Sequence, residues 1–392
     1  MTALQAIFWL AVGLLVYTQV GYGVLLALLC RLPAGRARSV PDGLPGPDAA
    51  ARPDATHQLP PPVTAIIAAY NEQDLIAQRI ANLRALEDPG GRLQVIVASD
   101  GSSDQTVARA RAAGADLVLD LPRAGKICAQ DAAVGHAAGE ILVFSDANAQ
   151  WQPDALAKIL AAFAADTRVG YVCGQVTFTD AHGTNQEGLY WRYEMWLRAM
   201  ESRLYSVTSG NGAIYATRRD TYIHVDPIAG HDLSFPFRMV KRGLRAVYVP
   251  QAHATEKMAP TLEGEFARKR RMARRTWPSM WRGGLVSPRG YPPRYALMIF
   301  SHRILRYLVP FLHVLALTVN LVLLRTGNPL YYFTLAVQLA LLASAALARR
   351  LPARPLLIAR YYVVTNAALA AGLWDWLRGE RSATWETVEG TR

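Results

Sequence analysis

Residues 63–72, VTAIIAAYNE, and residues 94–104, QVIVASDGSSD, decide the predicted fold. Each stretch begins with a short, continuous run of apolar and branched residues and ends in a polar turn, as buried strands do. An amphipathic helical pattern follows each turn, IAQRIANL after the first and TVARARAAG after the second. A third unit has a helical pattern at 126–139 and the strand ILVFS at 141–145. Alternating strands and helices with short loops predict an α/β fold with a mostly parallel sheet.

Polar and acidic residues collect where these strands end. Asn71 and Glu72 follow the first strand, Asp100 follows the second, and Asp146 and Asn148 follow the later one. Ligands of such sheets bind at the carboxyl ends of the strands. A turn or a helix cap would explain either aspartate alone. Their position at successive strand ends of one sheet favours a binding site.

An acid-rich edge repels a bare phosphate, so a nucleotide diphosphate bound there would need a divalent cation. Oxygen ligands suit Mg²⁺ or Mn²⁺, and Asp146 and Asn148 can supply them. Lys126 heads the third helical pattern and offers a cation near the same edge, although solvent exposure explains a lone lysine equally well. We therefore expect a site for a metal and a diphosphate at this edge.

Apolar segments flank the α/β pattern. Hydrophobic residues make up 52% of the 392 residues and charged residues only 18%, a balance that fits a soluble domain joined to membrane helices. Residues 1–30 contain a run without charge that is long enough to cross a bilayer, and no basic segment precedes it as in a signal peptide. Residues 31–61 are rich in Pro, Gly, Ala and Arg and are expected to be a linker. The α/β domain is expected at 62–282.

Further apolar segments follow this domain. Residues 290–307 carry His302 and neighbouring arginines within an apolar pattern, which predicts an amphipathic helix in the membrane interface. Residues 308–376 contain about three apolar runs that predict further spans. Residues 377–392 form the tail.

The basic residues indicate how the chain is oriented. Arg31, Arg36 and Arg38 follow the first span directly, and positive residues stay on the cytoplasmic side. This predicts a multi-pass protein of a bacterial-type inner (plasma) membrane with its α/β domain in the cytoplasm. Three cysteines without paired spacing indicate neither a disulfide framework nor a structural zinc site.

The net charge of +12 suits anionic lipids, phosphorylated substrates or nucleic acid. The densest cationic cluster, RKRRMARR at 268–275, adjoins the membrane segments and has no aromatic-laced recognition motif beside it. Nucleic acid is therefore not an expected partner. Membrane lipids are an expected partner.

The strings AAYNE, SDGSSDQT, a helix headed by GK, GEILVFSDAN and a later HDL together resemble the family 2 glycosyltransferases, which have the GT-A nucleotide-sugar fold. The likeness covers roughly residues 62–280, and the apolar flanks are similar to the membrane-bound branch with polysaccharide synthases and lipid glycosyltransferases. It implies an inverting transferase that moves a sugar from a nucleotide diphosphate sugar, with UDP-sugar expected, to a lipid-linked or glycan acceptor at the cytoplasmic membrane face.

The resemblance also implies roles for individual donor-side residues. The segment around Ala69, Tyr70 and Glu72 would contact the nucleoside, and Asp100 would bind the base and ribose. Lys126 would lie near the diphosphate.

Asp146 and Asn148 match the D-x-D element that holds the metal and diphosphate. The last position is Asn rather than Asp, so a metal would be held by one fewer charge.

On the acceptor side, Gly210 and Gly212 would let the backbone approach the ligand closely. Asp232 matches the general base of the family, and we favour this role; an N-cap of the helix that follows is the alternative, and the two roles are compatible. His231, at a position usually acidic in relatives, would tune Asp232 or simply pack.

The segment RKRRMARRTW stands where processive synthases carry Q-x-x-R-W. Arg271 and Arg274 keep the spacing of the first and fourth positions, but Arg275 replaces the tryptophan and Trp277 comes later. Arg271 and Arg274 are candidates for neutralising the leaving diphosphate, whereas contact with lipid phosphates suits most of the cluster. Trp277 would stack on a sugar or lie in the membrane interface.

Two alternatives remain open at the level of the sequence. A processive polysaccharide synthase competes with an enzyme that makes single or few additions, and the altered Q-x-x-R-W segment favours the latter. A membrane-tethered nucleotide-sugar-binding sensor would have lost the base, whereas Asp232 is present.

Overall fold

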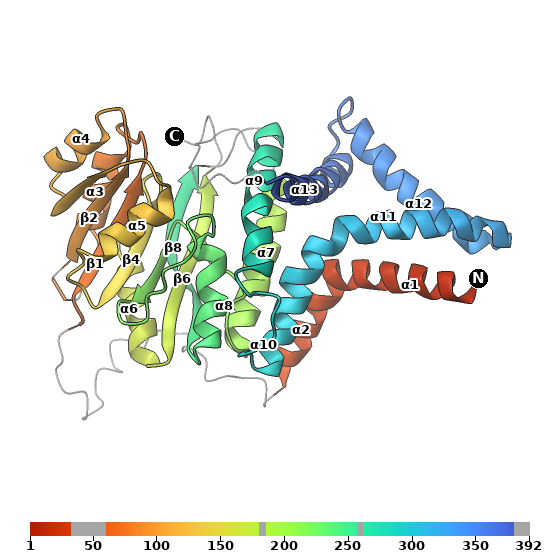
Figure 1. Ribbon diagram of the computed structural model, residues 1–392, viewed down its shortest axis with the longest axis horizontal. Coiled ribbons are helices and arrows are strands. Elements are labelled where there is room, and N and C mark those ends of the chain that lie inside the picture. The colour runs from red at the N-terminus through yellow and green to blue at the C-terminus, as the bar shows by residue number, and fades with distance from the viewer. Residues whose placement is uncertain (33–59, 89, 92, 180–185, 258–261, 380–392) are drawn as a thin grey trace.

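The computed structural model describes residues 1–32, 60–88, 90–91, 93–179, 186–257 and 262–379. A sheet flanked by helices makes up one end of the molecule, and long apolar helices make up the other (Figure 1). Helices α7 (Gln186–Leu204), α8 (His231–Lys241) and α9 (Leu262–Trp281) lie between the two parts.

The sheet has eight strands in the order β3-β2-β1-β4-β7-β6-β8-β5. Its first half is parallel: β1 (Val63–Ala69) lies between β2 (Leu93–Asp100) and β4 (Ile141–Asp146), and β3 (Leu117–Leu121) pairs with β2. Every residue of β1 is buried, which explains its continuous apolar sequence. The carboxyl ends of β1, β2 and β4 therefore meet at one edge, as predicted.

The second half of the sheet is mixed. It contains β5 (Gln150–Trp151), β6 (Val169–Thr179), β7 (Tyr215–Arg218) and β8 (Arg245–Lys257). Strand β7 runs antiparallel to both β4 and β6, whereas β6 and β8 are parallel. The antiparallel β7 brings the loop before it to the edge where β4 ends.

Apolar cores cover both faces of the sheet. Helices α3 (Ile76–Arg84), α4 (Thr106–Ala112) and α6 (Ala155–Ala165) contribute to one core, and α5 (Lys126–Val134) and α8 contribute to the other. Ile67 and Val97 point into the first core and Ile66 and Ile96 into the second, because side chains alternate along a strand. The predicted α/β fold is confirmed.

Among the described residues, four helical runs are long and apolar enough to cross a membrane. They are Thr2–Arg31 (α1, Thr2–Val16; a π turn, Tyr17–Gly21; α2, Tyr22–Arg31), Pro293–Thr326 (α10, Pro293–Met298; a π turn, Ile299–Ile304; α11, Leu305–Leu323; a final 3₁₀ turn, Leu324–Thr326), Pro329–Leu347 (α12) and Arg354–Leu377 (α13). Helix α1 lies beside α11 (Figure 1). These helices confirm the expected apolar segments.

The segment 290–307 differs from the expected separate interface helix. From Pro293 it is one uninterrupted helical run with the apolar helix α11. The polar residues that suggested an interface are satisfied inside the protein, since His302 and Arg306 contact Glu194 of α7. Because Glu194 pairs with His302 and Arg306, these two side chains do not need to face water.

Candidate active site

A cavity of about 260 Å³ opens at the end of β4 and extends to the apolar helices α11 and α13. The sheet supplies Asp146 and Glu256, the loop before β7 supplies Gly210 and Gly212, and α8 supplies Asp232. Helices α7, α9, α11 and α13 complete the wall. Residues from both parts of the molecule therefore form one site.

Hydrogen bonds join the loops that follow β1 and β2. The Asn71 backbone N–H donates to Ser102 Oγ at 3.1 Å, and Asn71 Oδ1 accepts from the Ser103 backbone N–H at 2.8 Å. The Glu72 backbone N–H donates to Thr106 Oγ1 at 2.8 Å. These bonds explain why AAYNE and SDGSSDQT occur together, because each loop supplies the partners of the other.

Arg123 lies on the donor side of this edge. Its guanidinium stacks over the Tyr70 ring, 3.4 Å from the centroid, so the end of β1 meets the loop before α5. Ala69, which precedes Tyr70, is fully buried, and Glu72 is 6% exposed.

Asp100 ends β2 and is 1% exposed. Its Oδ1 accepts from the backbone N–H groups of Ala124 (2.7 Å) and Gly125 (2.9 Å). Gly125 has a φ of 103°, a left-handed conformation that favours glycine. Oδ2 of Asp100 is buried and has no hydrogen-bond partner among the described residues. A buried oxygen left in this way is available to a polar ligand.

Lys126 and Asp146 form a direct ion pair across this edge, from the first residue of α5 to the last of β4. A Cβ on Gly212 would lie 3.3 Å from both Asp146 Oδ2 and Lys126 Nζ, so the backbone of this loop passes close to the pair. Asn148 follows two residues after Asp146 and is partly buried. The predicted donor residues Lys126 and Asp146 are thus brought together.

Glu256 is a cavity residue that the sequence analysis missed. Burial and the neighbouring Asp146 carboxylate raise the pKa of Glu256 to about 8. Its one sequence signal is its place near the end of a strand, in β8.

Asp232 lies in the first turn of α8 and lines the cavity. It is not the N-cap, because Gly230 holds that position and no side chain makes a cap hydrogen bond. A Cβ on Gly230 would lie 2.2 Å from Asp232 Oδ1, so the glycine makes room for the carboxylate. The Gly210 N–H donates to the Asp232 carbonyl at 2.7 Å and joins α8 to the loop before β7.

Gly210 and His231 are both closely packed against neighbouring aromatic residues. A Cβ on Gly210 would lie 1.9 Å from the Tyr171 hydroxyl, which leaves no room for a side chain. His231 is buried, stacks on Phe235 and shares a 2.8 Å hydrogen bond with the Tyr215 hydroxyl. Burial lowers the pKa of His231 to about 3, so the ring is neutral.

Helix α9 turns a different face to the cavity than the Q-x-x-R-W spacing suggested. The lining contains Arg268, Lys269, Met272 and Thr276, which share one helical face, and it contains neither Arg271 nor Arg274.

Helix α9 packs against α13 on another face. Arg274 borders a second cavity of about 220 Å³ with Trp376 of α13. Trp277 is buried, with Nε1 donating to the Leu369 carbonyl of α13 at 3.3 Å.

Residues 64–245 match the family model described as Glycosyl transferase family 2. This chain contains a family 2 glycosyltransferase domain.

Curated relatives of this chain are named as glycosyltransferases. A protein of Rhizobium meliloti (strain 1021) named N-acetylglucosaminyltransferase is 29% identical over 255 residues, covering 59% of each chain. A protein of the same name from Mesorhizobium japonicum is 29% identical over 241 residues, 55% of this chain and 56% of its own. The matches thus span little more than half the length of these relatives.

A solved structure is similar over almost the whole chain. The mannosyltransferase PcManGT from Pyrobaculum calidifontis, in complex with GDP-Man and Mn²⁺, has a TM-score of 0.71 and 22% identity. The similarity covers 96% of this chain and 100% of that one, so it includes the apolar helices as well as the glycosyltransferase domain.

The glycosyltransferase domain offers oxygen ligands that fit a divalent cation. Asp146 and Glu256 place two carboxylates close enough for one to raise the pKa of the other, a repulsion that a cation would relieve. No group of three His, Cys, Asp or Glu suited to a metal occurs among the described residues. Mg²⁺ and Mn²⁺ held with nucleotides commonly take few protein ligands and complete their shell with phosphate and water.

Proposed function

We propose that the glycosyltransferase transfers a sugar from a nucleotide diphosphate sugar to a hydroxyl of a lipid-linked or glycan acceptor at the cytoplasmic face of a bacterial-type inner membrane, with inversion. The supporting observation is that Asp146 and Asp232 line one cavity whose far wall consists of the apolar helices α11 and α13. The donor side and an entry from the membrane therefore share one space.

The donor nucleotide would occupy the edge formed by β1, β2 and β4. Asp100 would receive a polar group of the nucleoside at its buried Oδ2, and Tyr70 would border the base. Asp146 and Asn148 would hold Mg²⁺ or Mn²⁺, which supplies charge neutralisation to the diphosphate when bound. The names of the curated relatives make N-acetylglucosamine the first sugar to test. UDP is the carrier that the sequence resemblance implies.

Asp232 would act as the general base. Its carboxylate would take the proton of the acceptor hydroxyl while that oxygen forms a bond to the anomeric carbon. The bond from the anomeric carbon to the diphosphate oxygen breaks, and its electron pair leaves with the diphosphate. Arg268 and Lys269 line the same cavity and would compensate the charge that develops there.

The membrane arrangement follows from charge and length. Arg31 ends the first apolar run, and the glycosyltransferase domain follows it after the linker. By the positive-inside rule the N-terminus would lie outside and the domain inside.

Donor turnover by the purified full-length protein in nanodiscs tests this function. Mn²⁺ or Mg²⁺ and a panel of UDP- and GDP-sugars are supplied, and free nucleotide diphosphate is measured with and without bacterial lipid extract. Release from one donor that rises with lipid and is lost in Asp232→Asn is expected. Release from no donor, with tight donor binding, would instead favour a nucleotide-sugar-binding sensor. Long polymer on the acceptor would favour the processive alternative.

A further inference from the structure

Arg303 and Arg306 lie on an apolar helical run yet line the cavity that contains Asp232. Charged residues in such helices are costly and usually mark a ligand or a transport path. Arg303 lies within a π turn, Ile299–Ile304, a feature often found at functional sites, and Arg306 follows it in α11. The first apolar run contains another π turn, Tyr17–Gly21, and the two turns are joined by a 2.8 Å hydrogen bond between Tyr17 and Ser301.

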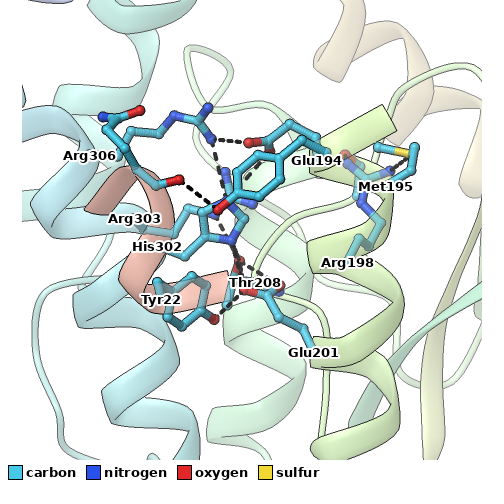
Figure 2. Close-up of polar contacts among 12 residues, drawn as sticks. Tyr22, Glu194, Met195, Arg198, Glu201, Thr208, His302, Arg303 and Arg306 are labelled. Atoms are coloured by element: carbon cyan, nitrogen blue, oxygen red, sulfur yellow. Dashed lines mark hydrogen bonds and ion pairs between the residues drawn. The ribbon is translucent and has the colours of Figure 1, made fainter. Parts of the chain in front are cut away.

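A buried network holds these arginines in place (Figure 2). Arg306 Nη1 lies 2.6 Å from Glu194 Oε1, and His302 lies between Glu194 (3.4 Å) and Glu201 (2.7 Å). Arg303 Nε donates to Thr208 Oγ1 at 2.9 Å, and Glu201 accepts from the Thr208 backbone N–H at 3.0 Å. The network joins α7 to the helical run that contains α11.

Positive charge is in excess at this end of the cavity. Burial alone would favour protonated carboxyl groups, but His302 and the neighbouring arginines outweigh it and lower the pKa of both Glu194 and Glu201. Arg303 has no carboxylate partner among the described residues. Arg198 lines the same cavity and donates to the Gly210 carbonyl at 2.9 Å. The guanidinium groups of Arg198, Arg303 and Arg306 thus outnumber the carboxylates of Glu194 and Glu201.

A further cavity of about 220 Å³, distinct from the one beside Arg274, lies one helical turn further along the same helices. Tyr307 of α11 and Thr365 of α13 line the first cavity, whereas Pro310 of α11 and Tyr362 of α13 line the further cavity. Helix α12 adds Leu341 and other residues, and the surface of this further cavity is apolar.

Three features therefore follow one another from the sheet into the apolar helices: the Asp232 carboxylate, the arginines, and the apolar cavity. A lipid with a phosphate between its apolar chain and its terminal hydroxyl has its groups in the same order. We propose that the acceptor is such a phosphate-bearing lipid, with its phosphate bound by Arg303 and Arg306 and its chain between α11 and α13. This inference rests on the proposed function.

The diphosphate of the donor is the other source of a phosphate for these arginines. Two observations favour the acceptor. The donor edge has cations of its own, Lys126 beside Asp146 and Arg268 and Lys269 on α9. Arg306 is adjacent in sequence to Tyr307 at the end of the cavity that leads to the apolar helices, away from the strand ends where the nucleoside is expected.

Lipid binding without turnover tests the proposal. The full-length protein in phosphatidylcholine nanodiscs is titrated with a polyprenyl phosphate or the matching neutral polyprenol, and bound lipid is counted by native mass spectrometry. Wild type should prefer the phosphate form by at least about tenfold, the scale of one strong charge-assisted contact. Arg303→Gln should remove most of that preference, Arg303→Lys should restore part of it, and Arg294→Gln, an exposed charge on α10, should leave it unchanged.

A second arm measures binding of UDP with Mn²⁺ to the same variants. Unchanged UDP affinity in Arg303→Gln is expected, whereas weaker UDP binding with unchanged lipid preference assigns the arginine to the donor and overturns the proposal. Equal binding of phosphate and alcohol by wild type overturns it even if Arg303→Gln does not fold. Lipid preference without sugar transfer would reject the proposed function alone. Transfer to a neutral acceptor that survives Arg303→Gln would reject this inference alone.

Discussion

Arg270 of α9 and Asp375 of α13 form a bidentate ion pair. Arg270 Nε donates to Asp375 Oδ2 and Arg270 Nη2 donates to Asp375 Oδ1, both at 2.6 Å. The Asp375 side chain is 4% exposed and the Arg270 side chain 44%. Next to the pair, a Cβ on Gly372 would lie 2.6 Å from the Ala273 Cβ, so the two helices touch through small residues. Helix α9, which lines the cavity, is thus fastened to an apolar helix.

Asp375→Asn should loosen this attachment. We expect a loss of about 1 to 2 kcal/mol in unfolding free energy, less than for a fully buried pair because Arg270 is partly in water. Transfer activity should fall more than nucleotide binding, since α9 contributes Arg268 and Lys269 to the cavity. Thermal unfolding in nanodiscs measures the first effect, with Asp220→Asn on an exposed loop as control. Equal stability of both variants would contradict the attachment.

Asp232→Asn should abolish transfer while donor binding persists. An amide keeps the size of the carboxylate but cannot take the proton, and loss of a general base typically costs about 10² to 10⁴ in rate. Single-turnover transfer and nucleotide binding by calorimetry separate the two effects. Asp120→Asn, which changes an exposed aspartate of β3, should retain full activity. Turnover within a few-fold of wild type would show that another group removes the proton.

Gly210→Ala should destabilise the domain by about 1 to 3 kcal/mol because its methyl group overlaps the Tyr171 hydroxyl. That hydroxyl is buried without a hydrogen-bond partner among the described residues, so Tyr171→Phe alone should be neutral or slightly stabilising. In the Tyr171→Phe background, Gly210→Ala should lower the free energy of unfolding by less than it does in wild type. Equilibrium unfolding of the four proteins of this cycle measures the coupling, and strict additivity would refute it.

The raised pKa of Glu256 predicts a pH dependence of stability. Because the folded state holds this proton more tightly than an unfolded chain with a pKa near 4.5, the stabilisation is complete below that pH and is lost as pH rises through about 8. Without metal, the Tm of wild type should therefore fall relative to Glu256→Gln between pH 5 and 9 by at least about 2 °C, which corresponds to roughly 1 kcal/mol.

Glu140→Gln, an exposed surface change, should follow the wild-type pH profile. Mn²⁺ with UDP should reduce the wild-type loss at high pH, because a cation relieves the repulsion between Glu256 and Asp146. Parallel profiles for wild type and Glu256→Gln would show that the two carboxylates do not interact.

Local pattern was sufficient to predict strands β1, β2 and β4 and the polar residues at their ends, but not strands β5 to β8. Val63–Ala69 is apolar except for Thr64 because the strand is buried on both faces, and parallel neighbours bring Asp100 and Asp146 to one edge. Spacing alone could not decide which face of α9 lines the cavity, because that depends on its docking against α13. It also could not predict that Glu194 and Arg306, 112 positions apart, would pair and let the helix continue.

The cavity wall is divided between the glycosyltransferase domain and the apolar helices, and this limits how the enzyme can be dissected. A soluble fragment cut near residue 282 would keep the nucleotide edge but lose the side of the cavity built from Arg303, Tyr307 and Thr365. Such a fragment should suit donor screening and fail in acceptor screening. Exchanging acceptor preference between relatives would likewise require grafting the helices that contain α11 and α13 together with α9, as a single module.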